Sequence, residues 1–305
     1  MDTQVVWNVM LELVIIMIIG YGLALFKLLD KSFSEKLSWL VVNISMPMLI
    51  IASVLGKEGN FKEVLVYLGY GTAFYLVSIP IAYICCKMLL VKKKNMGTYQ
   101  FMLIFSNCSF MGYPIASAVL GMDSVFYLSV FNMPFNVLAF SYGIFLLANG
   151  SDRGAGFNLR KLINPGIIAS VLAIVIYAMG IKLPRFVGNT FESVGGLTTP
   201  LSMLVLGITL AQLPVTELFN EIRLYPISLI RLVGLPFLTY YVMSLFTSNS
   251  MMLGVAVVTA GMPVASMTVM LATLYGGNVK LASVGVFITT VLSVVSVPLV
   301  LGFLL

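Results

Sequence analysis

The sequence contains no histidine, and charged residues make up only 9% of its 305 positions. Histidine is the side chain best suited to proton transfer near neutral pH and a frequent zinc ligand. The four aspartates fall at predicted termini or loops, so an aspartyl catalytic pair is unsupported. The three cysteines, Cys85, Cys86 and Cys108, lack the spacing of metal ligands. We therefore expect no enzymatic activity, no metal site and no cofactor.

Two further classes of function are disfavoured by what is missing. The sequence has no GxxxxGK[ST] phosphate-binding loop, which disfavours ATP-driven action. Its 17 lysines and arginines are scattered through short predicted loops, whereas nucleic-acid binding needs one continuous basic face. Nucleic acid is therefore not an expected partner.

Hydrophobic residues are abundant: they make up 60% of the chain, and the mean hydropathy is +1.06. A helix needs about 20 apolar residues to cross roughly 30 Å of hydrocarbon. The sequence predicts an all-α membrane protein with ten such helices, and the lipid bilayer as its surroundings. The predicted spans are Val5–Phe26, Leu37–Leu55, Val64–Leu90, Thr98–Val119, Ser124–Ala148, Pro165–Ile181, Phe191–Ala211, Leu224–Phe246, Met251–Tyr275 and Leu281–Leu304.

The basic residues predict an orientation in a cell membrane, inner or plasma. Twelve lysines and arginines lie in the loops of one side and four in those of the other, while Arg231 lies inside a predicted helix. Cytoplasmic loops are enriched in Lys and Arg. The Lys92–Lys94 loop is therefore expected in the cytoplasm, and both termini are expected outside.

A hexapeptide occurs twice, as Gly112–Ser117 (GYPIAS) and Gly261–Ser266 (GMPVAS), each time within a membrane-length apolar stretch. Proline breaks a membrane helix, and such breaks persist where protein or water satisfies the freed backbone. Proline pairs in matching order also relate the two halves, 1–150 and 151–305. Since each half holds five predicted helices, the halves must be inverted, with broken helices 4 and 9 crossing near the midplane.

Such a crossing predicts an anion site without buried charged residues. The N-terminus of a half-helix offers unpaired N–H groups and about half a positive charge, which suit a carboxylate. The sequence therefore favours a secondary transporter of a small organic anion that works by alternating access. A sodium-coupled symporter and a non-transporting membrane receptor or subunit are the alternatives.

The segment Asn107–Pro114 (NCSFMGYP) resembles the Asn-x-x-x-Met-Gly-x-Pro stretch of the auxin efflux carrier family, which includes plant PIN exporters and bacterial malonate-type permeases. This resemblance implies the fold of the bile-acid sodium symporters. In that fold helices 1, 2, 6 and 7 form a scaffold, and helices 3–5 and 8–10 form a moving domain of the elevator type. It also implies substrates such as malonate, malate or an auxin-like acid, and a homodimer through the scaffold is a further expectation.

The resemblance implies that Asn107 contacts a substrate carboxylate, that Pro114 forms the first break and that Pro263 forms the second. Ala256 stands where symmetry would place a second asparagine, and Thr259 is the nearest polar residue. Small polar or flexible residues complete the candidate binding set. They are Ser109, Gly112, Ser117 and Ser266 near the breaks, with Asn43, Ser45, Thr198 and Thr199 on the scaffold helices. The serines could instead serve helix packing.

Two charged residues lie within predicted helices. Arg231 follows Arg223 by eight residues, which places it about 12 Å deeper along a helix. At that depth a cation faces the protein interior or a water-filled cavity. It could cap carbonyl groups, attract substrate or take part in coupling. Glu12, within the first helix, is a candidate proton carrier, because desolvation favours the protonated form of a carboxyl group.

Overall fold

The computed structural model describes residues 3–52, 54–56, 61–121, 123–149, 165–212 and 221–305, and within these ranges the regular structure is helical. The first half contains α1 (Thr3–Leu25), α2 (Lys31–Leu40), α3 (Met46–Ala52), α4 (Phe61–Met88), α5 (Lys93–Ile104), α6 (Tyr113–Leu120), α7 (Asp123–Phe131), α8 (Met133–Leu138) and α9 (Ile144–Asn149). The second half contains α10 (Pro165–Ala178), α11 (Arg185–Gly196), α12 (Thr198–Ala211), α14 (Leu224–Leu229), α15 (Leu235–Ser244), α16 (Ser250–Gly261), α17 (Met267–Tyr275) and α18 (Val279–Leu304). Short π-helical turns join some of these segments: η1 (Val41–Ser45), η2 (Cys108–Gly112), η3 (Ala139–Gly143) and η5 (Ile230–Gly234).

Helices overlap each of the predicted apolar stretches, and six continuous helical runs in the described residues are long and apolar enough to cross a membrane. Those runs are Lys31–Ala52, Lys62–Met88, Asp123–Ala148, Arg185–Ala211, Leu224–Ser244 and Val279–Leu304. Three predicted starts were five or six residues too late, because the helices begin at Lys31, Lys93 and Arg185, before the apolar residues. The predicted boundary between the halves lies in residues 150–164, outside the described ranges.

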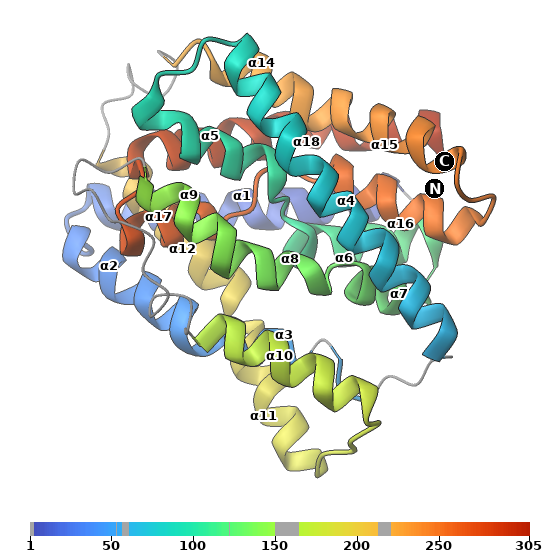
Figure 1. Cartoon of the computed structure of the whole chain (residues 1–305). Coiled ribbons are helices and arrows are strands. Elements are labelled where there is room, and N and C mark those ends of the chain that lie inside the picture. The colour runs from blue at the N-terminus through green and yellow to red at the C-terminus, as the bar shows by residue number, and fades with distance from the viewer. Residues whose placement is uncertain (1–2, 53, 57–60, 122, 150–164, 213–220) are drawn as a thin grey trace.

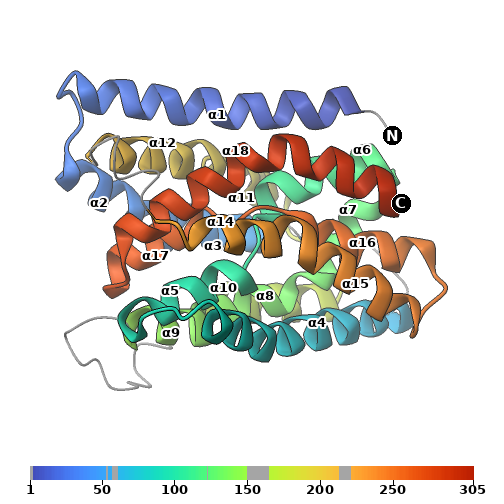
Figure 2. The ribbon, with the colours of Figure 1, turned by 90° about the horizontal axis from the view of Figure 1, so that it is seen from above.

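Helix α1 runs along one face of the molecule, and α4, with α5 and α9 beside it, runs along the opposite face (Figure 2). Helices α12 and α18 lie between these faces. Helices α3, α10 and α11 form a group that projects from the rest (Figure 1). The start of α1 and the end of α18 lie at the same end of the molecule.

The most buried elements are α5, α16 and α17, which belong to the two interrupted stretches. Eight consecutive residues of α5, Gly97 to Ile104, and eight of α16, Gly254 to Gly261, are all buried. By contrast, α1 and α4 expose large apolar side chains such as Ile18 and Leu76. An apolar outer surface around a buried centre suits a protein surrounded by lipid.

Helix α1 packs against α12 through two glycines. A Cβ atom added at Gly20 would lie 2.6 Å from the carbonyl oxygen of Leu204, and one at Gly207 would collide with the carbonyl oxygen of Met17. Small residues at such interfaces let membrane helices approach closely. The α1–α12 pair therefore depends on the absence of side chains at these two positions.

Three of the π-helical turns end just before a proline. The residues that precede these prolines, Met46, Tyr113 and Leu235, each donate a backbone N–H to the carbonyl five positions earlier. Proline has no N–H, and its ring collides with the preceding turn of a regular helix. In the wider turn the hydrogen bond runs to the carbonyl five positions earlier, and π-turns are frequent at functional sites.

Candidate functional site

The two interrupted helices meet at their breaks. Helix α5 ends at Ile104, and Phe105 continues in extended conformation with φ −102° and ψ 112°. Helix α16 ends at Gly261, and Met262 is likewise extended. The two extended segments pair in antiparallel fashion through a single bridge between Ser106 and Val264.

Hydrogen bonds across this crossing satisfy backbone groups that the breaks release. The Asn107 N–H donates to the Pro263 carbonyl at 2.8 Å, and the Ala265 N–H donates to the Phe105 carbonyl at 3.1 Å. The Val264 N–H donates to the Thr289 hydroxyl at 3.2 Å. An unpaired backbone group in hydrocarbon costs several kcal/mol, so each break supplies partners that the other needs.

The first break does not lie at Pro114, as predicted, but at Phe105–Asn107. Pro114 is the second residue of α6, and the π-turn η2 before it accommodates the proline within continuous helical structure. The chain is extended earlier because Phe105 and Asn107 pair with the second break. Pro263, in contrast, lies within its break, so the two repeated hexapeptides occupy different structural positions.

Arg231 lies beside the crossing and is 1% exposed. Its guanidinium group donates to three carbonyl oxygens: Leu103 at 2.8 Å, Met262 at 3.1 Å and Thr259 at 3.4 Å. Leu103 is near the C-terminal end of α5, and the other two are at that end of α16. The C-terminus of a helix carries about half a negative charge. Arg231 therefore neutralises the C-terminal ends of α5 and α16, which are the first halves of the two interrupted helices. This contact corresponds to carbonyl capping, one of the roles that the sequence left open for Arg231.

A small cavity of about 30 Å³ adjoins the breaks. Its walls combine residues of α3, such as Leu49, with residues at the starts of the second half-helices. These half-helices are η2 with α6, which begins after Asn107, and α17, which begins at Met267. The complete lining is Met46, Leu49, Ile50, Ser106, Asn107, Tyr113, Phe135, Asn136, Ala265 and Met267. A volume of this size holds about one water molecule, whereas ligand pockets usually measure roughly 300–1,000 Å³. The site must widen before it can hold a carboxylate.

Asn107 lines this cavity and carries a side-chain donor that has no partner among the described residues. The residue is 2% exposed, and its Nδ2 atom has no hydrogen-bond partner among the described residues. Leaving a buried donor unpaired costs about 1–3 kcal/mol. A carboxylate in the cavity would satisfy it. The start of α17 contributes further positive potential, because its first residue, Met267, and Ala265 just before the helix border the same space.

Three other predicted residues of the broken helices lie near the crossing without lining the cavity. A Cβ atom at Gly112 would lie 3.5 Å from the Met262 side chain, so η2 packs against the second break. The Thr259 hydroxyl donates to the carbonyl of Val255, one turn earlier. The Ser266 hydroxyl donates to that of Ser202 at 3.4 Å and thereby links the second break to α12.

The predicted scaffold residues also lie outside the cavity lining. Asn43 donates to the carbonyl of Trp39 at 2.8 Å, and Ser45 donates to that of Val41 at 3.4 Å, so both engage their own helix. The hydroxyl of Thr198 is buried without a partner among the described residues. Thr199 accepts a hydrogen bond from Ser202 through its carbonyl.

The remaining predictions concern residues away from the cavity or not fully described. Glu12 lies on an exposed part of α1. The side chains of Ser109, Pro114 and Ser117 are outside the described structure, although their backbone positions in η2 and α6 are given.

Three polar residues of the cavity were missed by the sequence reasoning: Ser106, Tyr113 and Asn136. Asn136 could have been found from the sequence, because it lies two residues after Pro134 in an apolar stretch. An amide side chain in such a stretch is costly unless it binds a partner. The neighbouring Asn132 is already engaged, since it accepts from the Tyr75 hydroxyl and donates to the Leu128 carbonyl at 3.0 Å. Asn136 is thus the better candidate for a ligand contact.

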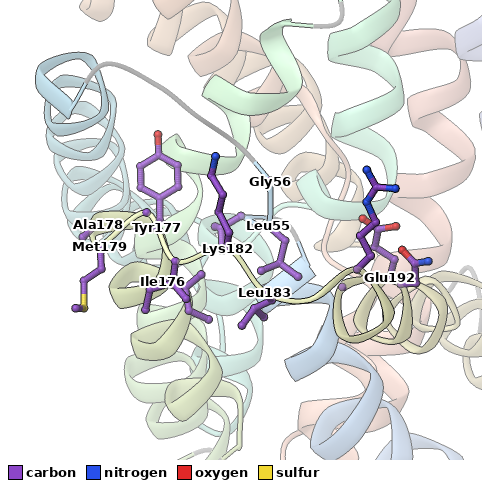
Figure 3. A pocket seen from close by; sticks show the side chains of 15 residues that line it. Leu55, Gly56, Ile176, Tyr177, Ala178, Met179, Lys182, Leu183 and Glu192 are labelled. Atoms are coloured by element: carbon purple, nitrogen blue, oxygen red, sulfur yellow. The ribbon is translucent and has the colours of Figure 1, made fainter.

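Three larger cavities share no lining residue with this site. One measures about 800 Å³ and lies between the end of α10 and the start of α11, where Lys182 and Glu192 are among its polar residues (Figure 3). The second measures about 580 Å³ and is lined by Lys31, Lys94 and Asn278, among others. The third measures about 360 Å³ and is lined mainly by apolar residues of α4 and α15. We place the candidate site at the smallest cavity, because it alone of the four is lined by residues of the breaks. In the described residues no cluster of His, Cys, Asp and Glu could hold a metal ion.

Apolar helices around two interrupted helices that cross beside a buried polar site are typical of membrane transport proteins. The chain matches the family described as membrane transport protein over residues 5–301, and so belongs to this family, that of the auxin efflux carriers. It is similar to an uncharacterized transporter of Methanocaldococcus jannaschii, with 25% identity over 96% of each chain. An uncharacterized transporter of Methanothermobacter thermautotrophicus is 24% identical over 95% of each chain. The uncharacterized transporter YfdV of Escherichia coli K12 is 22% identical over 66% of this chain and 68% of its own.

Proposed function

We propose that this protein is a secondary active transporter of a small organic anion, a carboxylate such as malonate, malate or an auxin-like acid. The carrying observation is the hydrogen-bonded crossing of two interrupted helices beside a cavity that contains the unpaired amide of Asn107. Broken helices of this kind form substrate sites in transporters, because their ends present backbone dipoles without a soluble domain.

The proposed architecture is a 5+5 inverted repeat of ten membrane-crossing helices, with the two halves at 1–150 and 151–305. Helices 1, 2, 6 and 7 would form the scaffold, and helices 3–5 and 8–10 would form the moving domain. Two observations support this division. The 30 Å³ cavity and the 580 Å³ cavity are each lined by residues of both groups, such as Leu49 with Asn107 and Lys31 with Lys94. A boundary that holds the polar cavities is a suitable plane for relative movement.

In the proposed mechanism the substrate carboxylate accepts a hydrogen bond from Asn107 and lies at the N-terminal ends of the second half-helices. Gly112, Pro263 and Thr259 shape the two interrupted helices around it. Ser109, Ser117 and Ser266 would line the substrate path next to the crossing. As the moving domain slides, Asn43, Ser45, Thr198 and Thr199 on the scaffold would come to face the site. Glu12 would carry a proton if transport is coupled to one.

We place the protein in the inner or plasma membrane with both termini outside and the Lys92–Lys94 loop in the cytoplasm. The 580 Å³ cavity would then open to the cytoplasm, since it includes Lys31 and Lys94. Its lining holds two lysines and one carboxylate, Glu35, and this net positive charge would attract anions toward the boundary between the two domains. A homodimer through the scaffold would leave the moving domain free at the periphery.

The function can be tested in two steps on the purified full-length protein. A thermal-shift screen of malonate, malate, lactate and indole acetate would identify a ligand, because compounds that bind the native state raise the melting temperature. Proteoliposomes would then be loaded with that compound and tested for uptake of its labelled form. Saturable exchange supports a transporter, whereas a thermal shift without flux would favour a receptor or subunit.

A further inference from the structure

Arg231 is the one charged side chain that is buried among the described residues. Its three hydrogen-bond acceptors are backbone carbonyls, and the described structure provides no buried carboxylate to balance the charge. A buried cation without an ionic partner is costly, so such residues in membrane segments usually serve a function. The carbonyl oxygens reduce that cost through the negative ends of two helix dipoles.

These carbonyls have the character of a cation site. In transporters with interrupted helices, coupling cations are held by unwound backbone carbonyls and by the C-terminal ends of half-helices. The acceptors of Arg231 meet both descriptions, since Leu103 and Thr259 lie in the last turns of α5 and α16 and Met262 lies in the extended break. The guanidinium group therefore occupies the carbonyl cluster that a mobile cation would need.

We propose that Arg231 is a resident cation that takes the place of a coupling metal ion at the crossing. As a positioning residue, it holds the C-terminal ends of both first half-helices together while the N-terminal ends of the second half-helices remain free for the anion. Its charge is permanent, because the guanidinium group stays protonated at physiological pH and is more weakly hydrated than an ammonium group. Anion binding and transport therefore require no sodium.

The contacts also explain how this charge reaches the anion site. Met262, an acceptor of Arg231, adjoins Pro263, whose carbonyl accepts from the Asn107 N–H. Asn107 in turn lines the cavity. The fixed cation thus belongs to the same hydrogen-bonded unit as the proposed substrate donor, and it moves with the breaks.

The cation site can be tested without any substrate. We would measure melting temperatures of the wild type and of Arg231→Ala in low millimolar guanidinium, sodium or potassium chloride, with choline chloride keeping the ionic strength constant. Arg231→Ala should be stabilised by guanidinium or sodium in a saturable manner, because the vacated carbonyls bind a free cation. The wild type should show no such effect. Arg223→Ala is the matched control: Arg223 also donates to a carbonyl, that of Leu89 at 3.2 Å, but is only partly buried.

Stabilisation of Arg223→Ala equal to that of Arg231→Ala, or no cation effect on Arg231→Ala, would overturn the proposal. So would a saturable sodium effect on the wild type, which is measurable even if Arg231→Ala does not fold. Arg231→Lys offers a second variant, since it keeps a cation but cannot reach three carbonyls with one planar group. It should fold and lack the guanidinium effect, and a guanidinium response equal to that of Arg231→Ala would also count against the proposal.

The transport half of this inference rests on the proposed function. In proteoliposomes with labelled malonate, or another carboxylate from the thermal screen, wild-type uptake should be unchanged when choline replaces sodium. Arg231→Ala should lose about tenfold or more, with partial recovery in guanidinium. Absence of uptake by the wild type would count against the transporter and leave the cation-binding result intact. Sodium-dependent uptake by the wild type would support the transporter and overturn the role given to Arg231.

Discussion

The backbone N–H of Asn107 donates to the carbonyl oxygen of Pro263 at 2.8 Å, which links residues 156 positions apart through the breaks of two helices. The Ala265 N–H closes the pair by donating to the Phe105 carbonyl. Because hydrogen bonds in a water-poor interior are costly to break, the two breaks should behave as one rigid unit. Whatever moves during transport must therefore carry both interrupted helices together.

Replacing Asn107 by alanine should weaken carboxylate binding while leaving the fold intact. The Nδ2 atom makes no hydrogen bond in the described structure, so its removal breaks no internal hydrogen bond of that donor. Losing one hydrogen bond to a charged ligand costs about 1.5–3 kcal/mol, or roughly ten- to hundredfold in dissociation constant. Titration of the purified variant with the carboxylate found by thermal shift would measure this loss.

Asn43→Ala is the control for that measurement. Asn43 also carries an amide on a membrane helix, but it donates to the carbonyl of Trp39 on its own helix. Its removal should leave the dissociation constant within a few-fold of the wild-type value. If Asn107→Ala folds normally and binds as tightly as Asn43→Ala, the amide of Asn107 has a structural role instead.

Gly20→Ala should destabilise the protein, whereas Gly22→Ala on the same helix should not. The new methyl group at Gly20 would lie 2.6 Å from the Leu204 carbonyl oxygen, while nothing lies within 4 Å of the corresponding position at Gly22. Overpacking of this kind costs about 1–3 kcal/mol, and alanine in place of glycine within a helix gains about 0.5–1 kcal/mol. Melting temperatures in detergent should fall for the first variant only. Equal melting temperatures would mean that α1 and α12 separate easily.

The orientation can be checked with single cysteines in a background without Cys85, Cys86 and Cys108. Lys94→Cys should react with a membrane-impermeant maleimide only after the cytoplasmic side is opened, and Lys182→Cys should react in intact cells. Both positions are exposed, and each substitution removes one positive charge from its own side. The reverse labelling pattern would show that the membrane orientation is inverted.

The helices were predictable because the bilayer imposes a length and an apolar composition on each crossing segment. Helical structure accordingly overlaps the stretches that hydropathy indicated. The starts at Lys31, Lys93 and Arg185 were not predictable on that basis, because polar residues extend these helices beyond the hydrocarbon. The Asp30 side chain, which accepts from the Phe33 N–H at 2.8 Å, fixes the first of them as a helix cap.

The position of the first break could not be read from local sequence. Phe105–Asn107 contains neither proline nor glycine, so its extended conformation depends on pairing with Pro263 and Ala265, which lie far away along the chain. Arg231 was different, since its depth in an apolar stretch predicted an interior position. Its carbonyl partners could be identified only from the structure, because they depend on the same long-range crossing.

The moving-domain proposal predicts that a disulfide between Cys substitutions at Ser202 and Ser266 will trap the protein in one access state. The two hydroxyl oxygens lie 3.4 Å apart, and they join α12 of the proposed scaffold to the second break in the proposed moving domain. Oxidation of the double variant in proteoliposomes should abolish uptake, and reduction should restore it. Asn95 and Asn278 offer a matched pair within the moving domain, with their amides 3.0 Å apart. A disulfide between Cys substitutions there should leave uptake largely unchanged. If both disulfides form and block uptake equally, or if the first has no effect, sliding of one domain against the other is excluded, and a fixed pathway with a local gate becomes the better description.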